Sequence, residues 1–460
     1  MAALIYRRSC CGGSAGVDAA RLPDIALRII TYSLCYPVAN RMAPFSNNSA
    51  FSLVTALAEQ RPVHTAFAWL HGNPKTIMDW QAEMVAIPAP PFGEQARAEW
   101  LTARFAEIGL SQVETDDAGN VFGWLPAAKL SPESTGPVVV ISAHLDTVFP
   151  AGSPLKPVVD GDRLTAPGAC DNGAGVAGML AIAQALVKAK VELAGALIFM
   201  GNVGEEGEGD LRGVRHLYQQ SALAGRIAAH IVLDGAGADS AVTQALGSRR
   251  YRVTITGPGG HSFTDAGTPN PIAALVSALA IVAKMQLPEE PRTTLNLGTV
   301  SGGTSVNSIP ESAQATVEFR STSTDELVRL EVELHCAVED AVEHCNAQAK
   351  TAGAQARGLL EFKIDKIGDR PAAQLPDGSP LLEALNAVDR HLGLKSELRL
   401  GSTDANIPLS LGIPALSIGA GGEGGGAHTL AEWYSARDRE TGLKRVLLLT
   451  LTMVEWAAEQ

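Results

Sequence analysis

Five separate segments of the chain carry an imidazole or a carboxylate at the end of an apolar run or in a glycine-rich turn. Such positions lie at the ends of strands, where a rigid sheet can hold metal ligands in place. Imidazole and carboxylate suit hard or borderline divalent cations, and thiolate is absent from these segments apart from Cys170. The candidate ligands are His144, Asp171, Glu206, Asp234 and His428, and Asp146 and Glu205 lie beside them.

The spacing within these segments separates ligands from residues that assist them. His144 and Asp146 are two positions apart at the end of a predicted strand, so their side chains face the same side. Asp146 can therefore orient the imidazole of His144, as carboxylates often do for metal-bound histidine. In a glycine-rich loop after a later strand, the adjacent Glu205 and Glu206 can divide two roles, one as a ligand and one as a general base.

Asp171 lies in a small-residue turn, between Gly168 and Gly173, immediately before a predicted helix. A carboxylate in this turn could bridge two metals. Two histidines with three or four carboxylates match a dinuclear hydrolase, whose ions lie roughly 3.5–4 Å apart and hold the scissile carbonyl and the attacking water. Each motif taken alone is more often a polar turn or a helix cap, so only the whole set favours a metal site.

The segments that position these residues alternate between strand and helix, a rhythm that predicts an α/β fold with a sheet flanked by helices. A helical pattern over 76–110 is interrupted by the prolines of 88–91, which forbid a continuous helix. The expected strands are 121–125, 137–143, 196–203, 229–233, 396–400 and 415–418. The expected helices are 172–188, 211–223, 380–392 and 441–456.

The rhythm changes near residue 248 and resumes after residue 371. Between these points the pattern predicts β-α-β-β-α-β, which is the split βαβ order of ferredoxin-like domains. We therefore expect a discontinuous catalytic domain over 61–246 and 371–460, with a smaller domain inserted at 247–370. Residues 1–60 are expected to form an extension that is disordered or not translated, and Met42 could be the working start.

Motifs from about residue 75 to the C-terminus resemble those of the M20 family of metallopeptidases. That family includes peptidase T-like tripeptidases, glutamate-releasing carboxypeptidases and aminoacylases. The resemblance implies a zinc-peptidase-like catalytic domain with a ferredoxin-like α+β lid. The matching motifs are Ile87-Pro88-Ala89-Pro90-Pro91-Phe92-Gly93-Glu94, His144-Leu145-Asp146-Thr147-Val148, Asp171-Asn172-Gly173, Glu205-Glu206-Gly207, Asp234-Gly235 and His428.

The resemblance implies two divalent metal ions per subunit, with Zn²⁺ expected and Co²⁺ or Mn²⁺ as alternatives. His144 and Asp234 are expected to hold one ion. Glu206 and His428 are expected to hold the other, and Asp171 is expected to bridge the two.

The resemblance also implies the catalytic roles. Glu205 is the expected general base, and Asp146 is the expected partner that orients His144. A cis peptide bond is expected at Asp171–Asn172, since such bonds outside X-Pro are usually functional.

In the family the inserted domain is a lid that often pairs with a second subunit, so a homodimer is expected. His261 resembles the lid histidine that reaches into an active site, which is the partner's if the dimer forms, and stabilises the tetrahedral oxyanion. Its alternative is a histidine at a strand end in solvent. Arg320 is expected to bind a terminal carboxylate, and its alternative is a surface salt bridge. The other expected substrate-binding residues are Asn307, Ser402 and Thr403.

Composition excludes several classes of protein. The net charge of -13 and the lack of a basic patch argue against binding to nucleic acid. No apolar run reaches the roughly 18 residues that cross a bilayer, so no membrane partner is expected. The 6 cysteines form no C-x-x-C pair and no disulfide framework in a chain of this length, which favours a cytoplasmic location.

Three functions remain open from the sequence. The leading one is a peptidase that acts on short peptides. The second is an N-acyl or N-carbamoyl amino-acid amidohydrolase with the same metal site, since the pocket that binds the acyl side carries no recognisable motif. The third is a metal-free binding relative, which would lack one of the ligands, whereas all of them are present.

Overall fold

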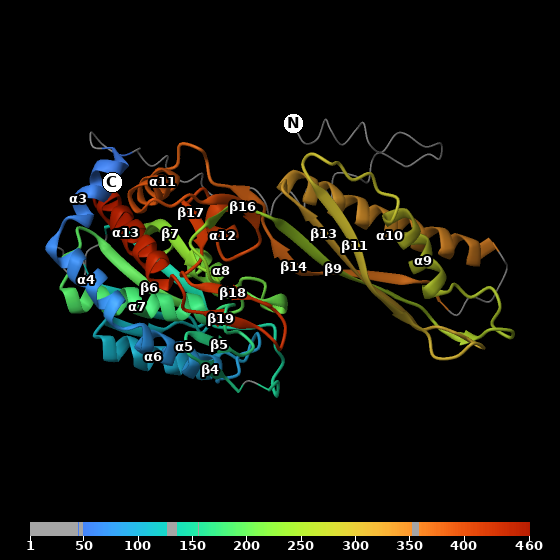
Figure 1. The fold of residues 1–460 in the computed structure, drawn as a ribbon. Helices are drawn as coiled ribbons and strands as arrows, with labels where there is room; N and C mark the ends of the chain where they lie inside the picture. The colour runs from blue at the N-terminus through green and yellow to red at the C-terminus, as the bar shows by residue number, and fades with distance from the viewer. Residues whose placement is uncertain (1–44, 46–48, 127–135, 155, 352–357) are drawn as a thin grey trace.

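The computed structural model describes residues 45, 49–126, 136–154, 156–351 and 358–460. A helix-covered sheet forms the larger part, and a narrower part extends from one end of it (Figure 1). The larger part combines chain from both sides of the insert, and its mixed sheet flanked by helices confirms the α/β fold class predicted from the sequence.

The larger part is built on a nine-stranded mixed sheet. Its strands are β1 (Ser111–Thr115), β2 (Val121–Leu125), β3 (Val138–His144), β6 (Ala196–Asn202), β7 (Ile227–Leu233), β8 (Ser240–Ala245), β15 (Ala373–Gln374), β16 (Glu397–Gly401) and β17 (Ala415–Ile418). The spatial order is β1-β2-β6-β3-β7-β17-β8-β15, and β16 pairs with β8. The central strands β6, β3, β7 and β17 run parallel, so their carboxyl ends meet at one edge.

Helices cover both faces of this sheet. Alternate residues of β3 enter different cores: Val139 and Ile141 pack with the long helices, and Val138 and Val140 pack with α8 on the other face. Because β3 is buried on both faces of the sheet, its sequence is a continuous run of apolar residues. The helices are α3 (Ala50–Ala58), α4 (Arg61–Gly72), α5 (Pro74–Val85), α6 (Gln95–Ile108), α7 (Gly173–Ala189), α8 (Arg212–Gln219), α11 (Pro380–Leu392), α12 (Asn406–Ser410) and α13 (Arg439–Ala458).

The narrower part is a four-stranded antiparallel sheet with two helices on one face. Its elements follow the β-α-β-β-α-β order expected from the sequence, and the strands lie in the order β11-β13-β9-β14. Tyr251, Val253 and Phe319 pack under both helices in a core of its own. The elements are β9 (Gly247–Thr256), α9 (Pro271–Val282), β11 (Thr293–Gly302), β13 (Ser312–Ser321), α10 (Thr324–Thr351) and β14 (Glu361–Arg370).

Two small sheets complete the described fold. A hairpin of β10 (Gly260–His261) and β12 (Ser308–Ile309) lies in the insert. Strands β4 (Val158–Asp160), β5 (Arg163–Thr165), β18 (Glu423–Gly425) and β19 (Trp433–Ser435) form the second sheet in the order β18-β19-β5-β4. This second sheet brings the loop after β18 to the segment that precedes Asp171.

The expectation of a disordered or untranslated extension over 1–60 is wrong at its C-terminal end. Ala50–Ala58 forms α3, which buries Val54 and Leu57 and packs against α11 and α13. Ser49 caps the helix by accepting a hydrogen bond from the backbone N–H of Ser52. The part of the expectation that concerns residues 1–44 and 46–48, including Met42, lies outside the described residues.

No helix among the described residues combines the length and the apolar character needed to cross a membrane.

Candidate metal centre and active site

His144 ends β3, and the turn that follows it carries Asp146. The carboxylate of Asp146 is fully buried and accepts hydrogen bonds from the backbone N–H groups of Glu205 (3.0 Å) and Glu206 (2.7 Å). Its Oδ1 lies 3.6 Å from Nδ1 of His144. Nδ1 of His144 also lies 3.1 Å from the main-chain carbonyl oxygen of Asp146. Asp146 therefore orients the imidazole mainly through its main chain, and its carboxylate fixes the backbone of the acidic pair.

Each carboxylate oxygen of Asp171 lies close to the imidazole of one histidine. Its Oδ1 lies 3.0 Å from Nε2 of His144, and its Oδ2 lies 3.1 Å from Nε2 of His428. Burial acts to raise the pKa of Asp171, but the hydrogen bonds from the two histidines outweigh burial and lower it. The peptide bond between Asp171 and Asn172 is cis, as expected from the sequence.

Two more carboxylates lie around these histidines. Oε1 of Glu206 is 3.1 Å from Nε2 of His428, and Oδ1 of Asp234 is 3.9 Å from Nε2 of His144. Ligand atoms of His144, Asp171 and Glu206 all lie within 4.8 Å of one another.

This donor set fits divalent cations. It consists of imidazole nitrogens and carboxylate oxygens, which suit zinc and similar ions. The hydrogen bond to Asp171 is the main reason that the pKa of His428 rises to about 9. Interactions with Asp146, Asp171 and Asp234 raise the pKa of His144 despite its burial. Metal ligands bind in their deprotonated form, so a cation at this place would replace these protons.

The turn after β6 presents Glu205 to Arg370 and Glu206 to His428. Gly204 and Gly207 flank the pair with positive φ values of 67° and 50°. A Cβ at Gly204 would come within 2.5 Å of the side chain of Arg212, so a glycine is required there on both counts. Burial raises the pKa of Glu205 well above its usual range, although the positive charge of Arg370 opposes this effect.

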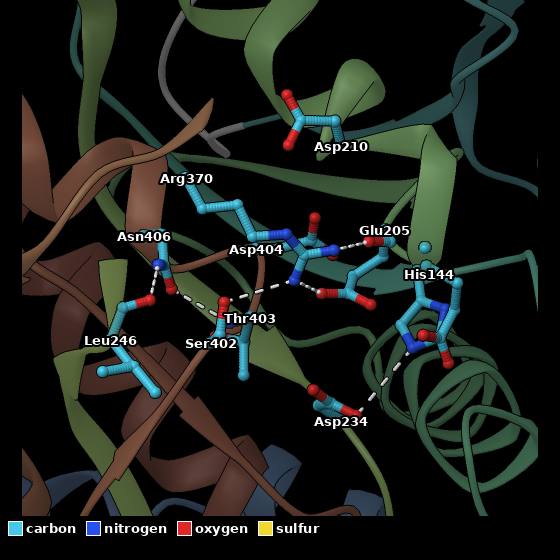
Figure 2. A network of polar contacts seen from close by, with 12 residues as sticks. His144, Glu205, Asp210, Asp234, Leu246, Arg370, Ser402, Thr403, Asp404 and Asn406 are labelled. Atoms are coloured by element: carbon cyan, nitrogen blue, oxygen red, sulfur yellow. Dashed lines mark hydrogen bonds and ion pairs between the residues drawn. The ribbon is translucent and has the colours of Figure 1, made fainter. Parts of the chain in front are cut away.

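Two residues that sequence reasoning did not single out, Arg370 and Glu432, take part in this site together with Asp404. Arg370 binds Glu205 and lies beside Ser402, which accepts a hydrogen bond of 3.3 Å from it (Figure 2). Glu432 is fully buried and accepts hydrogen bonds from three backbone N–H groups of the turn that contains Asp171. Asp404 is fully buried and accepts a hydrogen bond of 2.7 Å from Asn202.

Their sequence positions explain why they were missed. Arg370 and Glu432 lie 165 and 261 residues from Glu205 and Asp171, the partners they hold. The position of Glu432 four residues after His428 was the one available signal.

Two further expected residues, His261 and Arg320, lie in the inserted domain and make contacts within it. His261 is exposed on β10, and its Nδ1 accepts hydrogen bonds from the backbone of Phe263 and Thr264. Arg320 makes two hydrogen bonds of 3.0 Å to Glu318, which is the salt bridge left open as an alternative from the sequence.

Asn307 and Thr403 take part in local turns. Asn307 is exposed, and its Oδ1 accepts a hydrogen bond of 3.0 Å from the hydroxyl of Ser305. Thr403 is buried, and its backbone N–H donates to Asn406 (2.9 Å) immediately before α12. Thr403 therefore shapes the loop beside Ser402 (Figure 2).

This fold and this cluster are those of a metal-dependent hydrolase. The sequence model of peptidase family M20/M25/M40 matches residues 140–452, so the chain belongs to this family and is a hydrolytic enzyme of the peptidase class.

Individual relatives agree with this assignment. The chain is 26% identical over 365 residues to the uncharacterized protein YqjE of Bacillus subtilis, covering 76% of this chain and 91% of that protein. A tripeptidase from Staphylococcus aureus has a similar structure, with a TM-score of 0.64, 22% identity and coverage of 84% of this chain and 99% of that one. YXEP of Bacillus subtilis, described as a dinuclear metal binding peptidase from the M20 family, gives a TM-score of 0.52 at 19% identity and covers 83% of this chain and 98% of that one.

Proposed function

We propose that this enzyme cleaves amide bonds of short peptides with two divalent metal ions, Zn²⁺ being the expected metal. The observation that carries the proposal is the position of Asp171, whose two oxygens lie 3.0 Å and 3.1 Å from the Nε2 atoms of His144 and His428. A carboxylate between two imidazoles is the arrangement of a bridging ligand in a two-metal site.

The remaining ligands divide into two groups around Asp171. Asp234 lies on the side of His144, at 3.9 Å from its Nε2. Glu206 lies on the side of His428, at 3.1 Å from its Nε2. Each ion would thus receive one imidazole, one carboxylate of its own and one oxygen of the shared carboxylate.

Glu205 is the proposed general base. Bound divalent ions polarise the scissile carbonyl and lower the pKa of water. Oε2 of Glu205 would accept a proton from the water molecule whose oxygen attacks the carbonyl carbon. When the C–N bond breaks, the same carboxyl group would return this proton to the leaving amine nitrogen. Asp146 would hold the backbone of Glu205 and the ring of His144 in position during both transfers.

Peptide substrates are favoured by two lines of support. The neighbour from Staphylococcus aureus is described as a tripeptidase, and the neighbour YXEP is described as a dinuclear metal binding peptidase. In addition, Asp234 followed by Gly235 is typical of the peptidase T-like and dipeptidase side of the family.

The deciding experiment measures metal content together with hydrolysis of a panel of di- and tripeptides, N-acetyl amino acids and N-carbamoyl amino acids. We expect about two ions per chain and cleavage of the peptides, lost on chelation. Cleavage of the acylated or carbamoylated amino acids alone would move the function to an amidohydrolase with the same site. Lack of turnover with zinc, cobalt and manganese would contradict the proposal.

A substitution of the general base tests the mechanism separately from the substrate. Glu205→Gln keeps the size of the side chain but removes the proton acceptor. We expect kcat to fall on the order of 10²–10⁴-fold while the metal content stays unchanged. Near-normal kcat in this variant would remove Glu205 from the role of base.

We further propose a cytoplasmic homodimer that pairs through the inserted domain. β11 lies at the edge of the lid sheet, and Val300 on it is 60% exposed, which supports pairing with a second chain. In such a dimer His261 would serve the partner's site, and Asn307 and Arg320 would contribute to substrate binding. Sedimentation equilibrium of the wild type would contradict this proposal if it gave the monomer mass at all concentrations.

A further inference from the structure

Arg370 is the last residue of β14, at the point where the chain leaves the inserted domain and enters the catalytic domain. It pairs with Ser248 of β9 across the lid sheet, and only 7% of its side chain is exposed. The guanidinium points at Glu205 and not at the surface (Figure 2). A buried arginine at a domain junction therefore reaches the proposed base.

The guanidinium binds Glu205 at two separate places. Nη1 donates a hydrogen bond of 3.0 Å to Oε1 of the carboxylate, and Nη2 donates to the main-chain carbonyl of the same residue. Nη1 also donates to the hydroxyl of Ser402 at 3.3 Å. Because Arg370 binds both the main chain and the side chain of Glu205, the side chain of Glu205 loses the rotational freedom that a glutamate otherwise keeps.

The contacts with Arg370 determine which carboxylate oxygen of Glu205 is available to accept a proton. Oε1 of Glu205 is occupied by Arg370, whereas Oε2 has no hydrogen bond to any of the described residues. A general base needs one free oxygen in a fixed direction, and this arrangement supplies it.

The rest of the acidic loop is tied to the same end of the inserted domain. The backbone N–H of Asp369 donates to both carboxylate oxygens of Asp210 at 3.1 Å. Nη1 of Arg250, on β9, donates to the main-chain carbonyl of Gly207 at 3.1 Å. With the Arg370 contact, the loop that carries the base and a metal ligand is therefore held by two strands of the lid sheet.

We propose that Arg370 is a positioning residue that aims Oε2 of Glu205 at the attacking water and links the placement of the base to the inserted domain. The proposal rests on the proposed function, because it needs Glu205 to act as a base. In this role Arg370 acts through Glu205.

The experiment compares Arg370→Ala and Arg370→Lys with a control, Arg215→Met. Arg215 donates to the main-chain carbonyl of Asp369 at 2.7 Å, so it lies at the same junction but does not touch Glu205. In Arg370→Ala we expect kcat to fall about 100-fold, as misplacement of a catalytic group by about 1 Å can cause. KM and the number of bound metal ions should stay within about twofold of the wild type, since uniform binding is unaffected.

Two further readouts separate positioning from a merely structural role. Added guanidinium ion should restore part of kcat in Arg370→Ala but leave Arg215→Met unchanged. Arg370→Lys should recover only part of kcat, because an ammonium group lacks the fork that spans Oε1 and the main-chain carbonyl. A crystal structure of the lysine variant should show Glu205 in more than one rotamer.

The outcomes distinguish this proposal from the proposed function. Wild-type kcat in Arg370→Lys with a disordered Glu205, or equal losses in Arg370→Ala and Arg215→Met without guanidinium rescue, would overturn the positioning role. If Arg370→Ala does not fold, the kcat of Arg370→Lys and the conformation of Glu205 in its crystal structure test the positioning role. A wild type that hydrolyses no amide substrate would overturn the proposed function first, and the positioning role with it.

Discussion

Glu432 shows how a residue outside the ligand set can determine the geometry of a metal site. Its carboxylate accepts hydrogen bonds from the backbone N–H groups of Gly168 (2.8 Å), Cys170 (2.8 Å) and Asp171 (2.7 Å). It also lies four residues after His428. A single buried side chain therefore fixes the turn that carries Asp171 relative to the loop that carries His428.

Glu432→Gln should weaken metal binding without removing any ligand. The amide keeps one acceptor oxygen and places an NH₂ group against N–H donors, so the Asp171 turn loses at least one hydrogen bond. We expect the affinity for zinc to fall about 10–100-fold, as for other residues that support ligands. Competition with a chromogenic chelator measures this affinity. Glu423→Gln, on the neighbouring β18, is the control, and an equal affinity in both variants would contradict the role of Glu432.

His230 is a buried histidine whose titration should contribute to acid sensitivity. Its two ring nitrogens lie 3.0 Å from the hydroxyl of Tyr218 and 2.8 Å from that of Ser142. Burial lowers the pKa of His230 from 6.5 to about 3. The unfolded chain therefore binds more protons between these values, so the contribution of His230 to stability is present above pH 6.5 and is lost as the pH falls.

The expected size of this effect follows from the shift. Between pH 7.5 and pH 5.5 the wild type should lose about 1.4 kcal/mol more of its unfolding free energy than His230→Gln does. Urea unfolding of both proteins at the two pH values gives the difference. Equal losses in the two proteins would mean that His230 is not held in its neutral form.

At the scale of elements, many of the strands and helices around the site were predictable because the pattern of apolar residues in them is strong. β2, α11 and β17 begin and end where the apolar pattern predicts. β8 was missed because its buried positions, Ala241, Thr243 and Ala245, are small or polar, so the sequence shows no alternation of large apolar residues although the burial alternates. The ligand segments could be found from local patterns, whereas the contacts of Arg370 join distant segments and leave no local signal.

α3 was the element on which sequence reasoning failed, and it offers a direct test. Val54 is fully buried where α3 packs against α11 and α13. Val54→Asp should therefore cost about 3 kcal/mol or more of unfolding free energy, because an unpaired carboxylate would be buried. Ser52→Asp at the N-terminus of the same helix should be nearly neutral. Equal thermal unfolding temperatures for Val54→Asp and the wild type would mean that α3 does not contribute to the folded core.

At the scale of the whole molecule, the proposed metal ligands come from both sides of the inserted domain. His144, Asp171, Glu206 and Asp234 precede β9, whereas His428 follows β14 by more than fifty residues. Bound cations would therefore connect two distant parts of the chain. Several buried or half-buried carboxylates also lie together, and their mutual repulsion is relieved by positive charge.

Metal removal should consequently lower the stability of the whole catalytic domain. An ion that binds the native but not the unfolded state adds about 2.7 kcal/mol at a concentration 100 times its Kd. We expect zinc to raise, and chelator to lower, the unfolding temperature of the wild type, with a much smaller response in His428→Ala and Asp171→Asn. Differential scanning calorimetry at several zinc concentrations measures the response. A shift of equal size in all three proteins would show that zinc acts elsewhere on the molecule, because the two variants remove a ligand from each side of the chain that the cations are expected to join.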